Sequence, residues 1–475
     1  MLRMKKEVTF GLVVGTRGFF NPDLAAKGRE LLLQRMRQLG YRCVIPPAEM
    51  TTAGAVETRA DARKFAHAFS SKRDEIDGII ISLPNFGDEL AVIQTLEMAG
   101  LNVPVLVHAF DDELGKLDGA QRRDAFCGKI SVCNNLYQYG IHFTDTSFHT
   151  CAVESDAFAA DINRFARVCR VVGGLKGARI GAIGARPAAF QTVRASEKLL
   201  QASGITVVPT DLSEIFSAAE KLADESPDVK TKITEIRAYG KVAADVKPDS
   251  IARVARLSLV IERWLDENEI DAAAVQCWTS VQQNYGCCAC ASSSMLSEKL
   301  RPVACEVDIA GAVSMYALVL ATGQPAALVD WNNNYGQDRD KCIAQHCSNY
   351  PKSFIGGEIE ITHPWAISAK MGKDRCFGGI SGKAVPGPFT YCRVSTDDRA
   401  GRIKAYVGEG EFTDEPCSML GGIAICKIPG LQRLLKHMCA RGFEHHGAMA
   451  RTHVAEVVAE AFGKYMGWDV YQHQG

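Results

Sequence analysis

Strand-like and helix-like segments alternate along the first half of this chain, and no other feature constrains its fold as strongly. Residues 8–15 form an apolar run typical of a buried strand. Asn21 and Pro22 then offer an N-cap and a first-turn proline to a helix over residues 24–39, which Gly40 ends. Strands that alternate with helices form a parallel sheet with helices on its faces. The pattern continues with strands expected at residues 41–45, 76–83 and 103–108, and with helices near residues 57–71 and 88–98.

A second unit of the same kind is expected to begin near Gly173. Residues 212–268 are charged and helical in pattern, and residues 309–322 form an apolar helix that Gly323 ends. These segments again alternate with strands, which indicates a second parallel sheet. Strands are expected at residues 178–184, 205–209, 271–277, 302–305 and 326–329, and a further helix over residues 187–203.

The pattern changes after residue 350. Turn-forming pairs such as Gly356-Gly357 and Gly421-Gly422 recur between short alternating strands such as residues 402–407, which indicates antiparallel β structure. A helix over residues 454–466 closes the chain. We therefore predict two Rossmann-like α/β domains and a β-rich, barrel-like third. The expected domains are residues 1–172, residues 173–350 with the acids described below, and residues 351–475.

Composition and charge exclude several classes of function. The 475 residues suffice for about three domains at about 150 residues each, and a hydrophobic share of 47% argues against disorder. Lys plus Arg (54) balance Asp plus Glu (55), so the net charge of −1 gives no electrostatic footprint for nucleic acid or an anionic membrane. No apolar run approaches the ~20 residues of a membrane span, and no cleavage site follows the N-terminal strand. We expect a cytoplasmic protein.

Cysteine and glycine clusters offer weaker alternatives. The 17 cysteines are expected to be reduced thiols. The densest cluster, Cys287, Cys288 and Cys290, lacks the second Cys-x-x-Cys or Cys-x-x-His that would complete a zinc site. Glycines between Gly173 and Gly184 surround a predicted strand without the G-x-G-x-x-G spacing of a dinucleotide loop. An NAD-dependent dehydrogenase is therefore only a minor alternative.

Two carboxylates follow two of the predicted strands. Glu306 ends the strand at residues 302–305, and Asp330 ends the strand at residues 326–329. The carboxyl ends of neighbouring parallel strands meet at the sheet edge where α/β domains bind ligands, so we expect both acids at one edge. Like charges held together there repel each other unless a cation lies between them. Asp308 could merely be the N-cap of the following helix.

Histidines follow in two places. His346 comes soon after the second acid, and His445 and His446 form a pair near the C-terminus. Adjacent side chains of an extended segment face opposite ways, so only one of the pair can point into a given site.

These residues, in this order, resemble the L-fucose isomerase-like family, which belongs with the L-arabinose isomerases. The resemblance rests on Cys305-Glu306-Val-Asp308, Asp330-Trp331-Asn332-Asn333, His346-Cys347-Ser348-Asn349, the pair His445-His446 and the upstream Gln276-Cys277-Trp278. It implies two α/β domains, a barrel-containing third domain and one divalent metal ion, usually Mn²⁺, with Mg²⁺ or Co²⁺ as alternatives. The implied ligands are Glu306, Asp330 and His446.

The resemblance also implies a substrate pocket and an assembly. The implied sugar contacts are Arg17, Gln276, Trp278, Asn332, His346 and His445, although His346 could instead bind the metal. A hexamer is implied, in which the N-terminal domain of one subunit reaches the active site of another. The segment with Arg17, at the carboxyl edge of the first strand, is the one expected to reach across; it could equally be a plain βα loop.

The chemistry of these residues agrees with the resemblance. Oxygen-rich ligation favours Mn²⁺ or Mg²⁺, and two carboxylates can move a proton between C1 and C2 of an open-chain sugar through an enediol. We therefore predict a metal-dependent aldose–ketose isomerase, with Glu306 and Asp330 as the catalytic pair. A pentose, a deoxyhexose or an acid- or sulfonate-bearing hexose fits this chemistry. An anionic sugar would need a cation such as Arg17, Arg186 or Lys383 near the pocket. The main alternative is a non-catalytic sugar-binding protein of two α/β domains.

Overall fold

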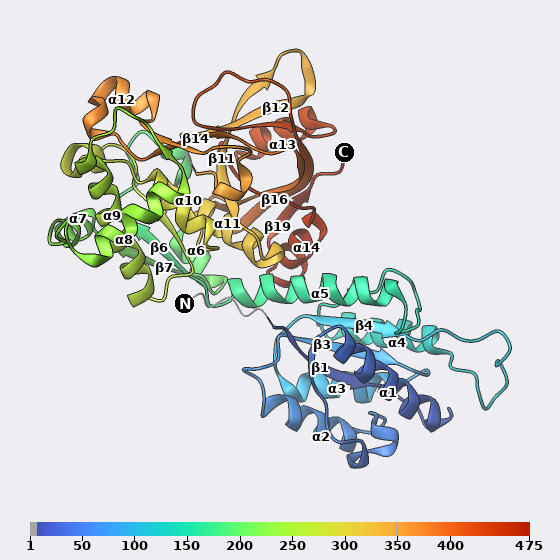
Figure 1. Cartoon of the computed structure of the whole chain (residues 1–475). Helices are drawn as coiled ribbons and strands as arrows, with labels where there is room; N and C mark the ends of the chain where they lie inside the picture. Colours follow the sequence, from blue (N-terminus) through green and yellow to red (C-terminus); the bar gives the residue numbers. More distant parts are fainter. Residues whose placement is uncertain (1–6, 348) are drawn as a thin grey trace. The chain divides into compact units, whose positions relative to one another are not determined.

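The alternating strands and helices of the first half form a parallel sheet in the computed structural model, which describes residues 7–347 and 349–475 (Figure 1). Residues up to Gly173 form one compact unit, and Gly174–Gly475 form another. The division into three domains at residues 172 and 350 stays a prediction.

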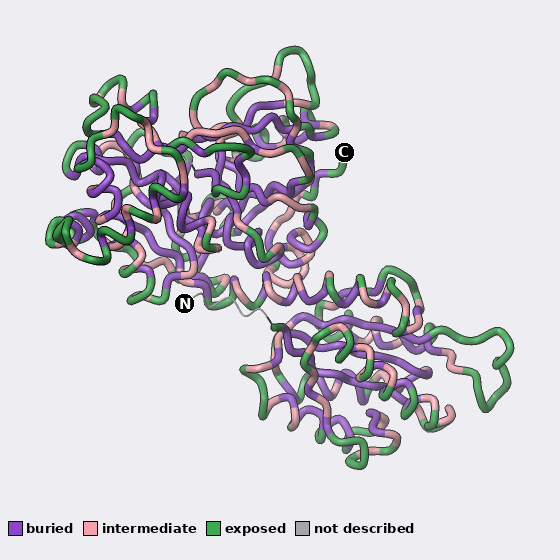
Figure 2. The backbone as a smooth tube through the Cα atoms, in the orientation of Figure 1, coloured by how far each residue is buried: buried purple, intermediate pink, exposed green. Residues whose placement is uncertain are grey.

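The N-terminal unit is a five-stranded parallel sheet in the order β2-β1-β3-β4-β5. Helices α2, α3 and α4 pack on one face of it and α1 and α5 on the other, so β1, β3 and β4 are entirely buried (Figure 2). The Asn21 side chain caps α1, as the sequence predicted. The elements are β1 Thr9–Val14, α1 Pro22–Gln38, β2 Arg42–Val44, α2 Arg59–Ser70, β3 Gly78–Leu83, α3 Glu89–Ala99, β4 Val105–Ala109, α4 Ala125–Gln138, β5 Thr144–Asp145 and α5 Asp156–Leu175.

The second unit begins with a four-stranded parallel sheet in the order β10-β9-β6-β7. The predicted helix over residues 187–203 is wrong in its first half. Ser196 caps Leu199, so a helix begins only at Glu197, and the residues before it form a loop with one 3-10 turn. The elements are β6 Arg179–Ile183, α6 Glu197–Ala202, β7 Thr206–Thr210, α7 Leu212–Glu220, α8 Pro227–Tyr239, α9 Pro248–Glu267, β9 Ala272–Val275, α10 Cys290–Glu298, β10 Val303–Cys305 and α11 Ile309–Thr322.

The same unit contains a closed antiparallel barrel. Its strands follow the order β16-β15-β18-β11-β12-β17, and β17 pairs back to β16. Phe389 and Phe412 stack at 4.3 Å between ring centroids in its core, and the Trp331 indole donates to the Tyr406 hydroxyl at 2.8 Å. The barrel strands are β11 Ala326–Tyr335, β12 Asp338–His346, β15 Gly387–Asp397, β16 Arg402–Thr413, β17 Gly422–Lys427 and β18 His446–Ala450.

Shorter strands and helices complete this unit. Strand β19 extends the sheet beyond β16, and β14, β13 and β8 extend it beyond β17. The helix predicted over residues 454–466 is present as α14 followed by a π-helical turn, Ala461–Tyr465. The elements are β8 Lys241–Val242, β13 Glu360–Thr362, α12 Trp365–Met371, β14 Gly379–Lys383, α13 Leu431–Arg441, α14 Ala455–Glu460 and β19 Asp469–Gln472.

The expectation that Glu306 and Asp330 follow neighbouring strands of one parallel sheet is wrong. Strand β11 lies in the barrel between β12 and β18, both antiparallel to it, and Asp330 lies in the middle of β11 rather than at its end. Helix α11 connects the two sheets, because it packs against β9 and β10 on one side and against β15 and β18 on the other.

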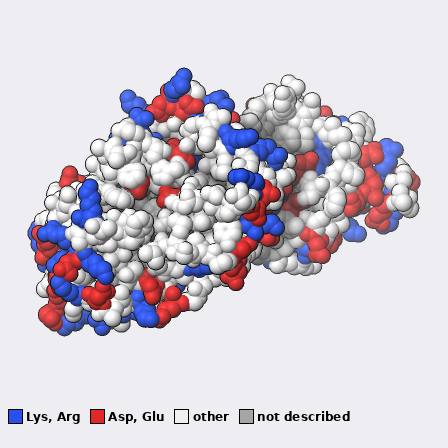
Figure 3. Space-filling view, turned by 90° about the horizontal axis from the view of Figure 1, so that it is seen from above, with Lys and Arg blue, Asp and Glu red and all other residues white. Residues whose placement is uncertain are grey.

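The predicted fold class of two parallel α/β layers and a β-rich, barrel-like part is confirmed. In the described residues no helix is long and apolar enough to cross a membrane. Basic and acidic side chains are interspersed on the face drawn in Figure 3, in keeping with the net charge of −1.

Candidate metal centre and active site

A sharp corner after β10 places the first acid. Glu306 and Val307 both adopt left-handed backbone conformations, with φ of 62° and 54°, which are rare for residues with a side chain. Asp308 ends the corner as the N-cap of α11, where its carboxylate accepts a hydrogen bond from the Gly311 amide at 2.8 Å. The corner leaves the Glu306 side chain buried at the carboxyl edge of the parallel sheet.

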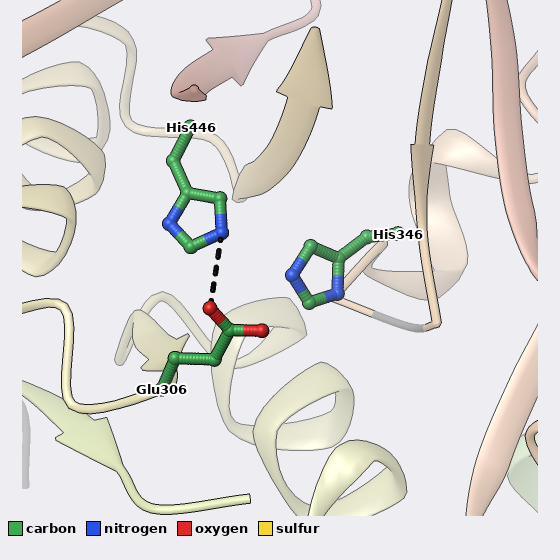
Figure 4. Close-up of side chains that lie close together, drawn as sticks. All are labelled: Glu306, His346 and His446. Carbon is green, nitrogen blue, oxygen red and sulfur yellow. Dashed lines mark ion pairs between the residues drawn. The ribbon is translucent and has the colours of Figure 1, made fainter. Parts of the chain in front are cut away.

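Strand register in the barrel places the second acid and its histidine. Asp330 on β11 lies directly opposite His446 on β18, so both side chains are on one face of the sheet. His446 Nε2 lies 3.4 Å from Asp330 Oδ1 and 3.7 Å from Glu306 Oε2. Figure 4 shows the His446 ring directed at the Glu306 carboxylate, with His346 beside both. The acids come from different sheets, and His446 is within reach of each.

A buried charged network lies on the other side of His446. Its Nδ1 is 2.8 Å from Asp308 Oδ2, and Arg393 Nη2 donates to Asp308 Oδ1 at 2.9 Å. Arg393 Nε also donates to Glu444 at 3.1 Å, and the Ser395 hydroxyl donates to the other Glu444 oxygen at 2.8 Å. The side chains of Asp308, Arg393 and His446 are fully buried.

These surroundings shift the pKa values of the three acids in different directions. Burial raises the pKa of Glu306 above its usual value. Burial also acts to raise the pKa of Asp330, but its contact with His446 and nearby histidine charges outweigh burial and lower it. The Arg393 charge and the His446 contact hold the pKa of Asp308 well below its usual range against the same effect of burial.

The donor set fits a divalent cation. Glu306 Oε2 and His446 Nε2 are buried, face each other and have no hydrogen-bond partner among the described residues, although buried polar atoms are normally paired. Two groups have ligand atoms within 4.8 Å of one another: Glu306 with His346 and His446, and Asp330 with His445 and His446. Each group joins His446 to one of the two acids, and carboxylate oxygens are ligands that suit Mn²⁺.

The remaining histidines lie close by in different settings. The His445 side chain is 40% exposed, and its Nε2 is 3.4 Å from Asp330 Oδ1. The buried His346 has its ring centroid 5.6 Å from that of His446, and its Nδ1 is 3.8 Å from the Cys347 thiol. Ser348, the next residue of this motif, lies outside the described residues.

Three other predicted sugar contacts lie in loops and at a strand irregularity. Gln276 ties two loops together, because its Oε1 accepts from the Ala185 amide at 2.9 Å and its Nε2 donates to the Trp278 carbonyl at 3.1 Å. The Trp278 ring lies 5.9 Å from that of Phe190. Asn332 is exposed at a β-bulge between β11 and β12. Their roles toward a sugar stay predictions.

Arg17 belongs to the N-terminal unit. Its guanidinium pairs with Glu89 and lies over the Phe86 ring at 4.3 Å from the centroid. Its predicted role across a subunit boundary stays a prediction.

Sequence reasoning missed Arg393 and Glu444. The visible signals were an arginine inside the apolar strand of residues 387–397 and a glutamate directly before the histidine pair. A buried arginine requires acidic partners, but only the fold shows that those partners are Asp308 and Glu444.

The glycine and cysteine clusters lie within regular elements or in the core. Gly173 and Gly174 lie within α5, and Gly181 lies within β6, where a Cβ would approach the Trp264 ring at 2.7 Å. Cys287, Cys288 and Cys290 are buried free thiols. Among the described residues, neither group of possible metal ligands includes a cysteine.

Comparisons with known proteins identify the family of the chain. Residues 11–176 match the fucose/sulfoquinovose isomerase N-terminal domain, and residues 344–474 match the L-fucose isomerase C-terminal domain. The chain belongs to the L-fucose isomerase-like family. It is therefore an isomerase, and the chemistry of its family is aldose–ketose interconversion, so the predicted enzyme class is confirmed and the non-catalytic alternative falls away.

Three relatives within the family carry the same name, sulfoquinovose isomerase. The protein of Priestia aryabhattai is 23% identical over 392 residues, which is 82% of this chain and 84% of that protein. The protein of Alkalicoccus urumqiensis is 25% identical over 303 residues, or 62% of this chain and 65% of that protein. The protein of Clostridium sp. (strain MSTE9) is 28% identical over 218 residues, or 45% and 47%.

The metal-free protein is expected to hold a proton on His446 well above neutral pH. Burial lowers the pKa of His446, but the nearby carboxylates of Asp308 and Asp330 outweigh burial and raise it to about 9. A raised folded-state pKa stabilises the fold fully below the unfolded value of about 6.5, and this contribution disappears as pH rises through about 9.

NMR titration of the histidine ring protons in chelator-treated protein, with His446→Gln to assign the resonance, measures this pKa. The unfolding free energy of the metal-free wild type should also fall between these pH values more steeply than that of His446→Gln. A titration midpoint at or below 6.5 contradicts the assignment.

Proposed function

We propose that this isomerase depends on a divalent metal ion, acts through an enediol and takes a sulfonated hexose of the sulfoquinovose type as its aldose. The observation that carries the proposal is the pair of orphaned buried atoms, Glu306 Oε2 and His446 Nε2, with Asp330 beside them. The substrate class follows from the names of the relatives. The aldose–ketose reaction itself follows from the family.

Glu306, Asp330 and His446 are the residues that hold the metal. Two carboxylates balance the charge of a divalent ion, so the site can accept the hydroxyl groups of a sugar. Mn²⁺ is the proposed ion, with Mg²⁺ or Co²⁺ as alternatives, and His346 is either a further ligand or a sugar contact. When bound, the ion polarises the carbonyl oxygen of the open-chain sugar and favours loss of the neighbouring proton.

The two carboxylates have different roles in the reaction. In the metal-free site, burial raises the pKa of Glu306, whereas contact with His446 lowers the pKa of Asp330 and keeps it ionised, so we assign the role of base to Glu306. Glu306 takes the proton from C2 and returns it to C1, while the hydroxyl proton passes from the oxygen at C2 to the oxygen at C1. Asp330 stays anionic and supports the positive charge of the site throughout.

A sulfonate requires a cation at some distance from the acids. Arg186 follows β6, and β9 separates β6 from β10, whose end carries Glu306. Two strand spacings place the ends of β6 and β10 about 10 Å apart, a span suited to an extended six-carbon chain. Arg186 Nη1 donates to the carbonyls of Pro187 at 2.9 Å and Phe190 at 3.2 Å, which leaves other N–H groups of the guanidinium for an anion. We assign Arg186 to the sulfonate.

The predicted hexamer, with Arg17 reaching the site of another subunit, remains part of this proposal. It makes Arg17, in the N-terminal unit, a second candidate for the sulfonate contact besides Arg186. The Arg186→Met experiment distinguishes the two.

Metal content tests the ligand assignment. Wild-type protein dialysed against Mn²⁺ should hold one ion per chain, and Glu306→Gln, Asp330→Asn and His446→Gln should each lower Mn²⁺ affinity by at least tenfold because each removes a ligand. Asn332→Ala, on the exposed bulge, serves as the matched control and should keep one ion. Elemental analysis and calorimetric titration measure the outcome. Retention of wild-type affinity by all three ligand variants rules out the assignment.

Isomerisation in D₂O tests the chemical route. Proton transfer by Glu306 predicts deuterium at C1 of the ketose, and Glu306→Gln should lower turnover by about 10²–10⁴ in samples of matched metal content. Mass spectrometry and NMR of the product measure the label. Complete retention of the substrate hydrogen during many turnovers, in wild-type protein at full activity, favours a hydride shift and contradicts the enediol.

Substrate recognition is tested with Arg186→Met and a matched control in the same loop, Arg194→Met. Arg194 is exposed and donates to the Gln191 carbonyl, so it has a comparable local role. Loss of a charged hydrogen bond should raise the KM for a sulfonated hexose by about 10- to 100-fold with little change in kcat. Equal effects of both variants, or none from Arg186→Met, would transfer the role to another cation such as Arg17.

A further inference from the structure

We infer that Asp308 is a positioning residue, which fixes the tautomer and orientation of His446 so that Nε2 presents its lone pair to the metal. This inference rests on the proposed metal site. The sequence offers Asp308 as an N-cap, and its carboxylate does accept a hydrogen bond from the Gly311 amide. This hydrogen bond is only one of the contacts that the carboxylate makes.

The contacts of Asp308 leave only one arrangement of protons. Its Oδ1 accepts from the Gly311 amide at 2.8 Å and from Arg393 Nη2 at 2.9 Å, while its Oδ2 accepts from Arg393 Nη1. Each of these partners can only donate. Asp308 is therefore a carboxylate with acceptors alone, and His446 Nδ1, 2.8 Å from Oδ2, must carry a hydrogen to contact it.

A hydrogen on Nδ1 leaves Nε2 as the lone-pair nitrogen of the neutral ring. That nitrogen is the one that faces Glu306 and Asp330. A carboxylate behind a metal-binding histidine both holds the ring in place and increases the basicity of the ligand. Asp308 thus keeps the hydrogen of the neutral ring on Nδ1 and leaves the lone pair of Nε2 for the metal ion.

Other N-caps in this chain show that capping alone does not require such a residue. Asp88 caps α3 through the Ala91 amide, and Asp211 caps α7 through the Ser213 amide in an exposed setting. Asp308 instead is fully buried and pairs with a fully buried arginine. The charge of Arg393 keeps the carboxylate ionised at this depth, which burial would otherwise oppose.

Asp308→Asn tests the inference because it removes the charge with almost no change in shape. The amide oxygen can still cap α11, since asparagine is as good an N-cap as aspartate. The amide NH₂ then occupies the place of Oδ2, where it faces two donors. His446 can avoid this clash only by accepting at Nδ1 and carrying its hydrogen on Nε2, as in a catalytic triad whose aspartate is changed to asparagine.

Two measurements follow. Mn²⁺ affinity of Asp308→Asn, from calorimetry or from the EPR signal of free Mn²⁺, should be about 10- to 100-fold weaker than that of wild type. Asp211→Asn, the same substitution at a cap without a histidine, should bind Mn²⁺ as wild type does. A drop in thermal stability with unchanged Mn²⁺ affinity would leave Asp308 a structural cap and overturn the inference.

A second measurement needs neither a variant nor a metal. In chelator-treated wild-type protein at a pH above the titration of His446, ¹⁵N NMR should show the hydrogen on Nδ1. A hydrogen on Nε2 overturns the inference even when the Mn²⁺ site is intact. Conversely, wild-type protein that binds no Mn²⁺ but carries the hydrogen on Nδ1 contradicts the proposed metal site and leaves the role of Asp308 toward His446 standing.

Discussion

The ion pair between Asp308 and Arg393 is the interaction on which the arrangement of the site depends. Removing two charges from water costs several kcal/mol per ion, and the pair is tolerable only when hydrogen bonds satisfy the remaining donors and acceptors. Here they do, because Gly311 and His446 complete the contacts of the carboxylate and Glu444 receives the remaining edge of the guanidinium. The pair joins the start of α11 to β15 and thereby fixes how the parallel sheet meets the barrel.

This junction explains why each sheet contributes one acid. Glu306 extends from a corner of strained backbone after β10, and Asp330 extends from the middle of a barrel strand beside His446. Helix α11 packs on both sheets, and the two acids come together at the junction that it forms.

Local signals in the sequence were sufficient for some of this arrangement. The helix over residues 309–322, its cap at Asp308 and the strand before Glu306 follow from apolar periodicity and capping chemistry, which act over a few residues. The sheet that contains Asp330 depends on pairing with β18, more than a hundred residues away, and no local pattern encodes that register. Arg393 was missed for the same reason, since its acids come from two other segments. The helix predicted over residues 187–203 begins only at Glu197, where the Ser196 amide donates to the Thr396 hydroxyl in the barrel, a contact between distant segments that no local pattern encodes.

The residues assigned to the chemical step and the residue assigned to the sulfonate lie in different kinds of structure. The residues assigned to the metal and the proton lie on strands or at the corner after β10, next to the buried ionic network of Asp308 and Arg393. Arg186, assigned to the sulfonate, lies in the loop after β6, which Gln276 attaches to the neighbouring loop through a single backbone hydrogen bond. Loops carried by a rigid scaffold tolerate change far better than a buried ionic network does. On the proposed assignment, the end of the sugar is recognised two strands away from the carbons that react, so changes in this loop should alter the substrate while the residues proposed to bind the metal stay the same.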